Sequence, residues 1–331
     1  MIPDRGNGQR TTRQAGRMKT VIPFVAQTHD SDQENWIAAL GKAMPDFVVK
    51  QSGALSDAER ENAQVAIVAD PDPAELARLP NLVWIHSLWA GVERIVKELP
   101  LNGPVIVRLE DPQMASTMAE AVLAWTLYLH RDMPRYRRQQ EQRIWKEHAL
   151  PLPSERTVGL LGMGALGRVA AAKLLEQGFR VCGWSRSGTQ VDGVESFRGE
   201  AELDRILGQC DIIVVLMPLT DETRGLIGER RLSAMRSGAS LINFARGPIV
   251  DTTALIGHLD SGHIDHAVLD VFDEEPLPSQ SPLWDHPQMT VLPHVSGPTN
   301  RTTASAIVAD NIRSYFETGR IPPGVDRARG Y

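Results

Sequence analysis

Apolar positions in this chain gather into short runs that alternate with amphipathic stretches of helical length. A helix-like stretch at 35–45 and a short helix after Gly91 separate some of these runs. Alternation of this kind is typical of a parallel sheet with helices on both faces. The first part of the chain therefore predicts an α/β domain, whose strands we expect at residues 20–27, 47–50, 65–69, 83–88 and 105–109.

Residues 116–138 have a different pattern. Ser116 is a suitable N-cap, and the long helix that follows it is apolar in its first half and rich in arginine in its second. A helix with so much apolar surface has to be buried between domains or at a subunit interface.

After residue 156 the alternation of strands and helices resumes. A last helix, expected at 302–319, leads to a proline-rich tail, and we expect it to cross back and pack on the first domain. The sequence therefore predicts two doubly wound parallel-sheet α/β domains. The first comprises residues 18–115 plus 302–331, and the second comprises residues 116–301 with the long helix.

Composition narrows the class of protein. With 42% hydrophobic and 23% charged residues, the chain has the balance of a soluble globular protein. Its formal charge of -6 and pI near 5.9 argue against a nucleic-acid partner. No apolar run reaches the roughly 20 residues of a membrane span. Cys182 and Cys210 lie in or beside apolar runs, as buried thiols of a cytoplasmic protein do, so we expect a cytoplasmic location.

The N-terminal residues 1–17 contain arginines but no apolar segment, so they do not form a secretory signal. We expect a disordered leader, an alternative start ahead of Met18, or a remnant of expression.

Gly162, Gly164 and Gly167 form a G-x-G-x-x-G motif between a predicted strand, 157–161, and a predicted helix. In this context the first glycine makes a tight turn, the second lets the backbone approach a pyrophosphate, and the third lets the helix pack on the strand. The pyrophosphate then lies at the helix N-terminus, where free N–H groups favour negative charge. The motif predicts a nicotinamide dinucleotide site, whose loop also contains Met163, Ala165 and Leu166.

The strand after this loop bears on which dinucleotide is bound. NAD sites place an acidic residue about 20 positions on, where it binds the ribose 2′-hydroxyl. Here the strand ends in Ser185, Arg186 and Ser187, and no carboxylate follows before Asp192. A guanidinium and two hydroxyls suit a 2′-phosphate, so the sequence predicts NADP(H) as the preferred cofactor, with NAD(H) possible. The alternative is a solvated arginine at a strand end.

Three polar residues follow predicted strands further along the chain, where strand ends line the cleft of an open sheet. They are Arg246 in NFARG, Glu275 in LDVFDEEPLP and His294 in LPHVSGPT. Arginine suits the carboxylate and carbonyl oxygen of a 2-keto acid, and histidine can protonate the developing alkoxide. A carboxylate beside that histidine fixes its tautomer and favours its charged form. Each residue alone could have a purely structural role. Together, downstream of a dinucleotide loop, they predict the reduction of a 2-keto acid.

The second half of the chain resembles the D-isomer-specific 2-hydroxyacid dehydrogenases over nearly its whole length. GLLGMGALG, NFARGPIVD, LDVFDEEPLPSQSPLW and LPHVSGPT occur in the order of that family's signature blocks. LWAGVERIV, VRLEDPQM, MAEAVLAW and GWSRS are similar to the bacterial glyoxylate/hydroxypyruvate reductases of the A type within the family. The resemblance implies a flavodoxin-like substrate domain, a Rossmann NAD(P)-binding domain, an active site in the cleft between them, and a homodimer whose interface includes the long helix.

The resemblance also implies roles for single residues of the substrate site. Arg246 would bind substrate, Glu275 would orient His294, and His294 would be the acid/base. The substrate carboxylate would further meet the backbone N–H groups of Ala90, Gly91 and Val92.

The implied cofactor site extends beyond the glycine loop. Asp270 would contact the nicotinamide carboxamide. The remaining contacts would come from the ends of neighbouring strands, at Leu216, Pro218, Thr223, Phe244, Ala245, Ser296 and Gly297.

One stretch departs from the A-type pattern. These reductases carry a tryptophan in the early loop that covers the active site, and the corresponding residues 44–53 have none. Either Phe47 substitutes for it or the pocket mouth is more open, which bears on substrate size. Trp89 and Trp284 are candidate walls of the substrate pocket, and they suit the core or an interface equally well.

These observations predict the NADPH-dependent reduction of small 2-keto acids, glyoxylate to glycolate and hydroxypyruvate to D-glycerate. We expect no nucleic-acid, membrane or metal partner. His258, His263 and His266 lie in a helix-to-strand region without cysteine, which favours solvated histidines over a metal site. The alternatives are a reductase for larger 2-keto acids and a non-catalytic dinucleotide-sensing protein on the same fold.

Overall fold

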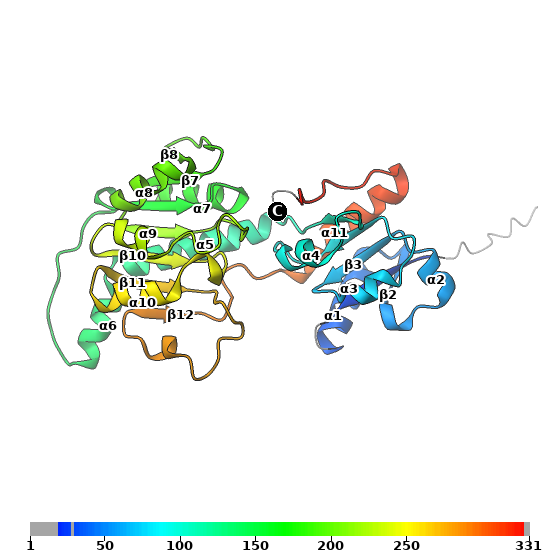
Figure 1. The fold of residues 1–331 in the computed structure, drawn as a ribbon, viewed down its shortest axis with the longest axis horizontal. Helices are drawn as coiled ribbons and strands as arrows, with labels where there is room; N and C mark the ends of the chain where they lie inside the picture. Colours follow the sequence, from blue (N-terminus) through cyan, green and yellow to red (C-terminus); the bar gives the residue numbers. More distant parts are fainter. Residues whose placement is uncertain (1–18, 28–29, 328–331) are drawn as a thin grey trace, which may run out of the picture.

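The computed structural model describes residues 19–27 and 30–327 and contains two α/β domains, each built on a parallel sheet (Figure 1). The two lobes are joined near the middle of the molecule, which is elongated in this view. This architecture confirms the predicted fold class. The expected leader at 1–17 and the last residues, 328–331, lie outside the described residues.

The first domain has a five-stranded sheet in the order β2-β1-β3-β4-β5, with parallel pairing throughout. Its central strand β3 is buried along its whole length, as expected for a strand covered on both faces. The strands are β1 Thr20–Ala26, β2 Phe47–Gln51, β3 Val65–Ala69, β4 Trp84–Ser87 and β5 Val105–Val107. The helices are α1 Asp30–Ala43, α2 Asp57–Glu61, α3 Pro73–Ala77, α4 Glu93–Glu98 and α11 Arg301–Thr318.

The two faces of this sheet carry separate apolar cores. On one face, Trp36 and Leu40 of α1 pack with Val308 and Ile312 of α11. On the other face, residues of α3 and α4 such as Leu76 pack against the sheet. Because α11 comes from the end of the chain, the first domain is built from two separate segments (Figure 1).

The second domain has a seven-stranded sheet in the order β12-β11-β10-β9-β6-β7-β8. The chain enters this sheet at β6, adds β7 and β8 on one side of it, and then adds β9 to β12 on the other side. The carboxyl end of β6 is therefore a topological switch point. The strands are β6 Thr157–Leu161, β7 Arg180–Ser185, β8 Val194–Arg198, β9 Ile212–Val215, β10 Ala239–Asn243, β11 Ile264–Leu269 and β12 Met289–Val291. The covering helices are α7 Ala165–Glu176, α8 Gly199–Gln209, α9 Glu229–Ala234 and α10 Thr252–Asp260.

The region expected to form one long helix at 116–138 contains two helices, α5 Pro112–His130 and α6 Met133–Glu141. The helix begins four residues before the expected cap, because Asp111 is the residue whose side chain accepts a hydrogen bond from the N–H of Gln113, at 2.8 Å. The first helix ends at His130, and Asp132, two residues further on, has a left-handed backbone with φ of 53°. The apolar face of α5 is buried in the core of the second domain, at Met118, Ala119, Val122 and Leu129.

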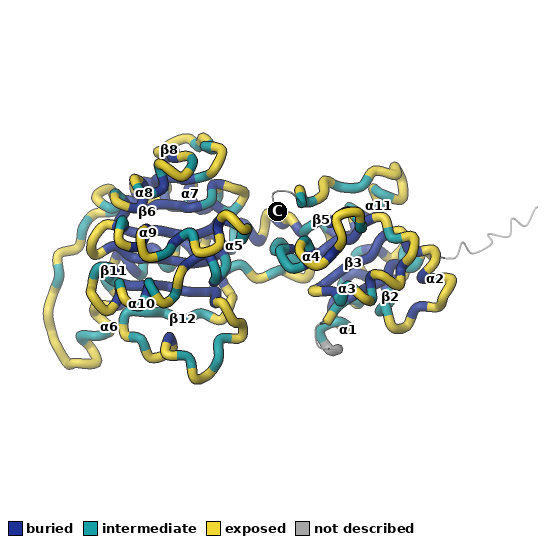
Figure 2. The backbone as a smooth tube through the Cα atoms, viewed as in Figure 1, coloured by how far each residue is buried: buried dark blue, intermediate teal, exposed yellow. Residues whose placement is uncertain are grey.

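Short 3-10 turns complete the fold, at Ser52–Ala54, Pro153–Glu155, Gly247–Ile249 and Pro282–Asp285. Figure 2 shows that both sheets lie in buried layers, while the loops and outer helix faces are exposed. In the part of the chain that the structure describes, no helix combines the length and the apolar character needed to cross a membrane.

Candidate active site

The glycine loop follows β6 at the switch point of the second sheet. Gly162 has φ of 118°, and a Cβ atom there would lie 2.7 Å from the backbone nitrogen of Met217. A Cβ atom on Gly167 would lie 2.0 Å from the oxygen of Gly162, so helix and loop pack too closely for any larger residue. Gly164 differs, because nothing lies within 4 Å of a Cβ atom placed there, immediately before the first turn of α7. The two outer glycines are required by packing, and the middle one leaves open space for a ligand.

Ser185, Arg186 and Ser187 leave the carboxyl end of β7, the strand beside β6. The Ser185 hydroxyl accepts a hydrogen bond from the N–H of Thr189 at 2.9 Å, which closes the turn. The Arg186 side chain forms an ion pair with Glu222, from the loop after β9 on the opposite side of β6. Sequence reasoning missed Glu222, because no local pattern connects it to Arg186.

The loop after β9 carries the three residues expected to flank the cofactor. Leu216 is buried and its carbonyl carbon lies against Gly162. The Thr223 hydroxyl donates a hydrogen bond to the oxygen of Pro218 at 2.7 Å and accepts one from the N–H of Thr220 at 2.7 Å. The structure therefore brings this loop against the glycine loop and fixes it with side-chain hydrogen bonds.

His294 and Glu275 lie together, with Nδ1 of the imidazole 2.7 Å from Oε2 of the carboxylate. The other oxygen, Oε1, accepts a hydrogen bond from the N–H of Phe272 at 2.9 Å, which fixes the carboxylate. Because the carboxylate occupies Nδ1, the proton on that nitrogen points to Glu275 and Nε2 remains for another partner. The His294 side chain is 49% exposed, so that partner can reach it from solvent.

Asp270 is nearly fully buried at the end of β11, with 1% of its surface exposed. Its two oxygens accept hydrogen bonds from the N–H groups of Val295 and Ser296, at 2.8 and 2.9 Å. His294 precedes these residues and has a left-handed backbone, with φ of 53°. Asp270 therefore holds the segment that carries His294, a role that the sequence did not suggest.

Two further residues of this segment were expected to bind the cofactor. The buried hydroxyl of Ser296 has no hydrogen-bond partner among the described residues. A Cβ atom on Gly297 would lie 2.7 Å from the terminal carbon of Met118 on α5. Ser296 thus offers an unused polar atom beside Asp270, whereas Gly297 is explained by close packing on α5.

Arg246 follows β10 and reaches the first domain. The Asn243 side chain supports the turn, donating to the oxygen of Arg246 at 3.0 Å and accepting from the N–H of Ala245 at 3.2 Å. The guanidinium donates to the oxygen of Ala245 at 2.8 Å and lies 3.4 Å from the carboxylate of Glu93. A Cβ atom on Gly91 would lie 1.8 Å from Nη2 of Arg246, so the 90–92 loop and the guanidinium are in direct apposition.

The other residues expected at the substrate pocket differ in their surroundings. The Trp89 ring contacts Trp36 edge to face, with centroids 5.9 Å apart, and packs against the apolar core formed by α1, α11 and the first sheet. The Phe47 ring contacts Phe316 of α11, with centroids 5.3 Å apart, and so also serves packing of the first domain. Trp284 is 48% exposed, and its indole N–H donates to the oxygen of Pro278 on the loop that follows Glu275. Ala90 and Val92 flank Gly91, while Phe244 and Ala245 are buried before Arg246.

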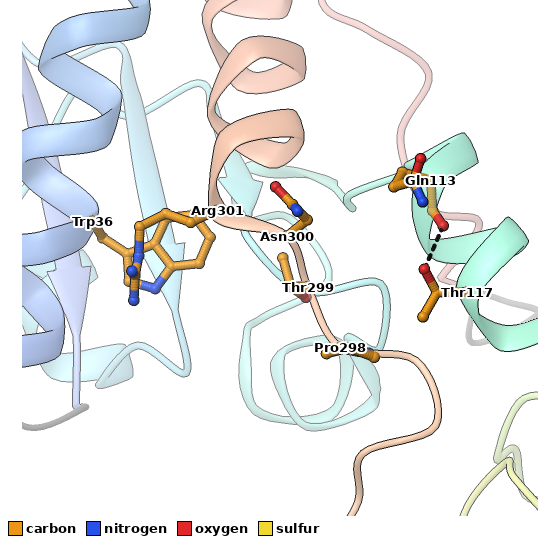
Figure 3. Close-up of a pocket in the computed structure, with 7 residues that line it drawn as sticks. All are labelled: Trp36, Gln113, Thr117, Pro298, Thr299, Asn300 and Arg301. Atoms are coloured by element: carbon orange, nitrogen blue, oxygen red, sulfur yellow. Dashed lines mark hydrogen bonds between the residues drawn. The ribbon is translucent and has the colours of Figure 1, made fainter. Parts of the chain in front are cut away.

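The two segments that cross between the domains are hydrogen-bonded to each other. The Thr303 hydroxyl donates to the carboxylate of Asp111 at 2.5 Å, tying the start of α11 to the start of α5. A hollow of about 400 Å³ lies beside the start of α11, and Figure 3 shows the Arg301 side chain stacked over Trp36 at its edge. The proposed catalytic residues do not line it; its walls are Trp36, Gln113, Thr117, Pro298, Thr299, Asn300 and Arg301.

The histidines considered as metal ligands have other partners. His258 contacts Glu229, His263 contacts the oxygen of Leu232, and His266 is buried beside Thr290. Within residues 19–27 and 30–327, no group of three or more histidine, cysteine, aspartate or glutamate side chains could hold a metal ion.

Comparison with known proteins places this geometry in a family. Residues 123–296 match the family described as D-isomer specific 2-hydroxyacid dehydrogenase, NAD binding domain. A D-isomer specific 2-hydroxyacid dehydrogenase from Xanthobacter autotrophicus Py2, solved with NADPH and MES, is 38% identical. Its alignment covers 95% of this chain and 100% of that chain, with a TM-score of 0.88.

Two other solved structures extend the comparison. The NADPH-dependent glyoxylate/hydroxypyruvate reductase from Sinorhizobium meliloti, in complex with NADP and sulfate, is 32% identical over 95% of this chain and 100% of that chain, with a TM-score of 0.86. A D-isomer specific 2-hydroxyacid dehydrogenase family protein from Klebsiella pneumoniae is 31% identical over 93% of this chain and 97% of that chain, with a TM-score of 0.83. The two-domain fold, the glycine loop and these matches show that the chain belongs to the D-isomer specific 2-hydroxyacid dehydrogenases, which are NAD(P)-dependent enzymes.

Proposed function

We propose that this enzyme reduces small 2-keto acids with NADPH, converting glyoxylate to glycolate and hydroxypyruvate to D-glycerate. The observation that carries the proposal is the His294–Glu275 pair on the same domain as Arg246, whose guanidinium faces the Gly91 loop of the other domain. An acid/base and a cation for a carboxylate are the two groups that reduction of a 2-keto acid requires. The similar Sinorhizobium meliloti enzyme, named a glyoxylate/hydroxypyruvate reductase, supports the choice of substrate.

The second domain suits the dinucleotide on structural grounds. The space in front of Gly164 and the first turn of α7 would hold the pyrophosphate, and Ser185, Arg186 and Ser187 would hold the 2′-phosphate. The unused hydroxyl of buried Ser296 and the carboxylate of Asp270 would face the nicotinamide. When bound, the cofactor supplies the hydride that reduces carbon 2 of the substrate.

The residues of this chain would bind and orient the keto acid between the domains. Backbone N–H groups of Ala90, Gly91 and Val92 would receive the carboxylate, with the Arg246 guanidinium on its other side and against the carbonyl oxygen. Glycine at position 91 leaves room for this approach, because a side chain there would occupy the position of the guanidinium. Fixing both ends of a short substrate in this way supplies orientation, which contributes strongly to the rate.

His294 would donate its Nε2 proton to the oxygen that becomes the alkoxide. Glu275 holds Nδ1 and stabilises the positive charge that the ring carries before it gives up this proton. Because Glu275 is itself fixed by the N–H of Phe272, the imidazole is held in one orientation.

Stopped-flow oxidation of NADPH with glyoxylate tests the catalytic assignment. We expect His294→Ala to lower turnover by about 100-fold or more, because general acid catalysis contributes about that much. His148→Ala, which changes a histidine outside the proposed site, serves as the control. Unchanged turnover in His294→Ala would show that another group protonates the product.

A substrate panel with NADPH and NADH in parallel tests substrate and cofactor choice. Glyoxylate and hydroxypyruvate should be reduced faster with NADPH than with NADH. Faster reduction of larger 2-keto acids would instead indicate an open pocket mouth, to which the half-exposed Trp284 would belong. Equal rates with both cofactors would contradict the role of Arg186.

We further propose that the enzyme is a homodimer. Trp145 is 98% exposed on the long loop between α6 and β6, and Ile144, Leu150 and Leu152 of the same loop are exposed as well. Figure 2 shows this loop at the outer edge of the second lobe. Large exposed apolar side chains gathered on one loop are expected to be covered by a partner. Light scattering should find a dimer for the unmodified enzyme and a monomer for Trp145→Asp.

A cytoplasmic location is also proposed. Cys182 and Cys210 are both buried and free although their side chains are neighbours, as expected in a reducing compartment. Contact with Cys182, and then burial, raises the pKa of the Cys210 thiol, which keeps it protonated. Localisation of a tagged chain by cell fractionation tests the assignment.

A further inference from the structure

The ion pair between Arg186 and Glu222 spans the glycine loop. In the second sheet β6 lies between β7 and β9, and the glycine loop leaves its carboxyl end. Arg186 comes from the loop after β7 and Glu222 from the loop after β9, so the pair connects the two loops on either side of the cofactor loop. Both side chains are substantially exposed, at 42% and 67%, so a ligand can reach them without unfolding either loop.

Arg186 is also the cation that suits the 2′-phosphate of NADP(H). The Glu222 carboxylate and the 2′-phosphate can therefore bind the same guanidinium. A phosphate dianion binds arginine through several oxygens and can replace a single exposed carboxylate. The 2′-hydroxyl of NAD(H) carries no charge and leaves the Glu222 contact intact. The Glu222 carboxylate therefore weakens the binding of NADP(H) and leaves the binding of NAD(H) unchanged.

We propose that Glu222 is a cofactor-specificity residue: it competes with the 2′-phosphate for Arg186 and thereby limits the preference of the site for NADP(H) over NAD(H). This inference rests on the proposed use of NADPH, because it needs the 2′-phosphate to bind at Arg186. With Arg186 paired to Glu222, the site can accept the uncharged ribose hydroxyl of NAD(H) while this ion pair stays in place.

The neighbouring Asp221 supplies a matched control. It lies on the same exposed turn and carries the same charge, and it forms no ion pair within the described part of the chain. Asp221→Asn therefore removes one negative charge from this surface without releasing Arg186. Thr223 holds the turn through Pro218 and Thr220, so neither substitution disturbs its backbone.

Isothermal titration of the purified enzyme with NADP+ and with NAD+ tests the proposal without turnover. Glu222→Gln should tighten NADP+ binding by about fivefold, the upper range for an exposed ion pair, and should leave NAD+ binding within about twofold. Asp221→Asn should change neither by more than about twofold, and the gain in Glu222→Gln should shrink as salt is raised from about 0.05 to 0.5 M.

Repeating the Glu222→Gln substitution in the Arg186→Ala variant tests whether its effect depends on the Arg186–Glu222 ion pair. There Glu222→Gln should have no effect on NADP+ binding, because the guanidinium for which Glu222 and the 2′-phosphate compete is gone. The proposal is overturned if Glu222→Gln leaves NADP+ binding unchanged, if NADP+ and NAD+ tighten alike, or if Asp221→Asn gives the same gain. The proposed cofactor choice fails separately, if the unmodified enzyme binds NAD+ more tightly than NADP+ and Arg186→Ala does not weaken NADP+ binding.

Discussion

The carboxylate of Glu93, at the start of α4 in the first domain, lies 3.4 Å from the guanidinium of Arg246 in the second domain. It meets the side of the arginine that faces Gly91, since a Cβ atom on Gly91 would lie 3.0 Å from Oε2 of Glu93. Glu93 thus holds the guanidinium beside the loop proposed to bind the substrate carboxylate. Glu93, in the first domain, therefore contributes by orienting the Arg246 side chain of the second domain.

Replacement of Glu93 should therefore act on the use of substrate. Glu93→Ala is expected to lower kcat/KM for glyoxylate by about tenfold, because a displaced Arg246 guanidinium would no longer face the carbonyl oxygen of the substrate. Glu93→Gln keeps an oxygen that accepts from Arg246 and should remain within about threefold of the unmodified enzyme. Steady-state kinetics with saturating NADPH measure both values.

Glu98→Ala is the control, because Glu98 lies on the same helix and pairs with Arg94 at the surface. Its kinetics should be unchanged. Equal losses in Glu93→Ala and Glu93→Gln would show that charge rather than positioning matters.

Gly91→Ala should inactivate the enzyme without unfolding it. A Cβ atom there would lie 1.8 Å from Nη2 of Arg246, and the far end of that flexible side chain can move away. The guanidinium then leaves the proposed substrate site, and we expect kcat/KM to fall by about 100-fold. The thermal midpoint should change little, which circular dichroism can verify.

Gly41→Ala provides the comparison. Nothing lies within 4 Å of a Cβ atom at Gly41, which is inside α1. Alanine is the better helix former by about 0.5–1 kcal/mol, so this variant should keep its activity and unfold at a slightly higher temperature. Full activity of Gly91→Ala would remove Gly91 from the proposed site.

The parts of the candidate site that depend on local order could be expected from the sequence. The glycine loop needs only a strand, a tight turn and a helix in succession, and its outer glycines are indeed required by contacts of 2.0 and 2.7 Å. His294 and Glu275 follow strands whose carboxyl ends meet at one sheet edge, so their proximity could be expected from topology.

The missed residues depend on contacts between distant parts of the chain. Glu93 and Arg246 are 153 positions apart, and Glu222 and Arg186 are 36 positions apart, so only the fold reveals these pairs. The break between α5 and α6 is a different case. Pro134 at the start of α6 was a usable signal, because proline lacks the N–H that would continue the helix.

Asp270→Asn tests whether the hold on the His294 segment matters. The amide nitrogen of asparagine cannot accept from a backbone N–H, so one of the bonds to Val295 and Ser296 is lost and a buried donor is left unpaired. We expect a cost of about 1–3 kcal/mol in the free energy of unfolding and at least a tenfold lower kcat.

Hydrogen exchange distinguishes this effect from general destabilisation. Amides of the segment that follows His294 should exchange faster in Asp270→Asn, while those of β6 stay protected. Loss of kcat with unchanged exchange in that segment would assign Asp270 to the cofactor alone.

The stability of the first domain should depend on pH through His86. This residue is buried in β4, where Asn311 donates to Nε2 at 2.9 Å and Nδ1 donates to the oxygen of Ser87 at 2.9 Å. Both ring nitrogens are therefore satisfied by the neutral form. Burial lowers the pKa of His86 from 6.5 to about 4.

The sign of the effect follows from proton counting. Between pH 6.5 and about 4 the unfolded chain protonates this histidine and the folded protein does not, so the free energy of unfolding falls as pH is lowered through this window. Burial lowers the pKa of His266 in the second domain to about 3, and this adds a loss of the same sign that extends further down. Above pH 6.5 both contributions are fully present.

Thermal unfolding measured at intervals from pH 7.5 to 4 checks this expectation. The midpoint should be level above about pH 6.5 and should decline below it, because each pH unit in the window costs up to about 1.4 kcal/mol per histidine. His86→Gln can keep both hydrogen bonds but cannot titrate, so it should show a shallower decline between pH 6.5 and 4. Parallel curves for the two proteins would mean that other groups cause the acid sensitivity.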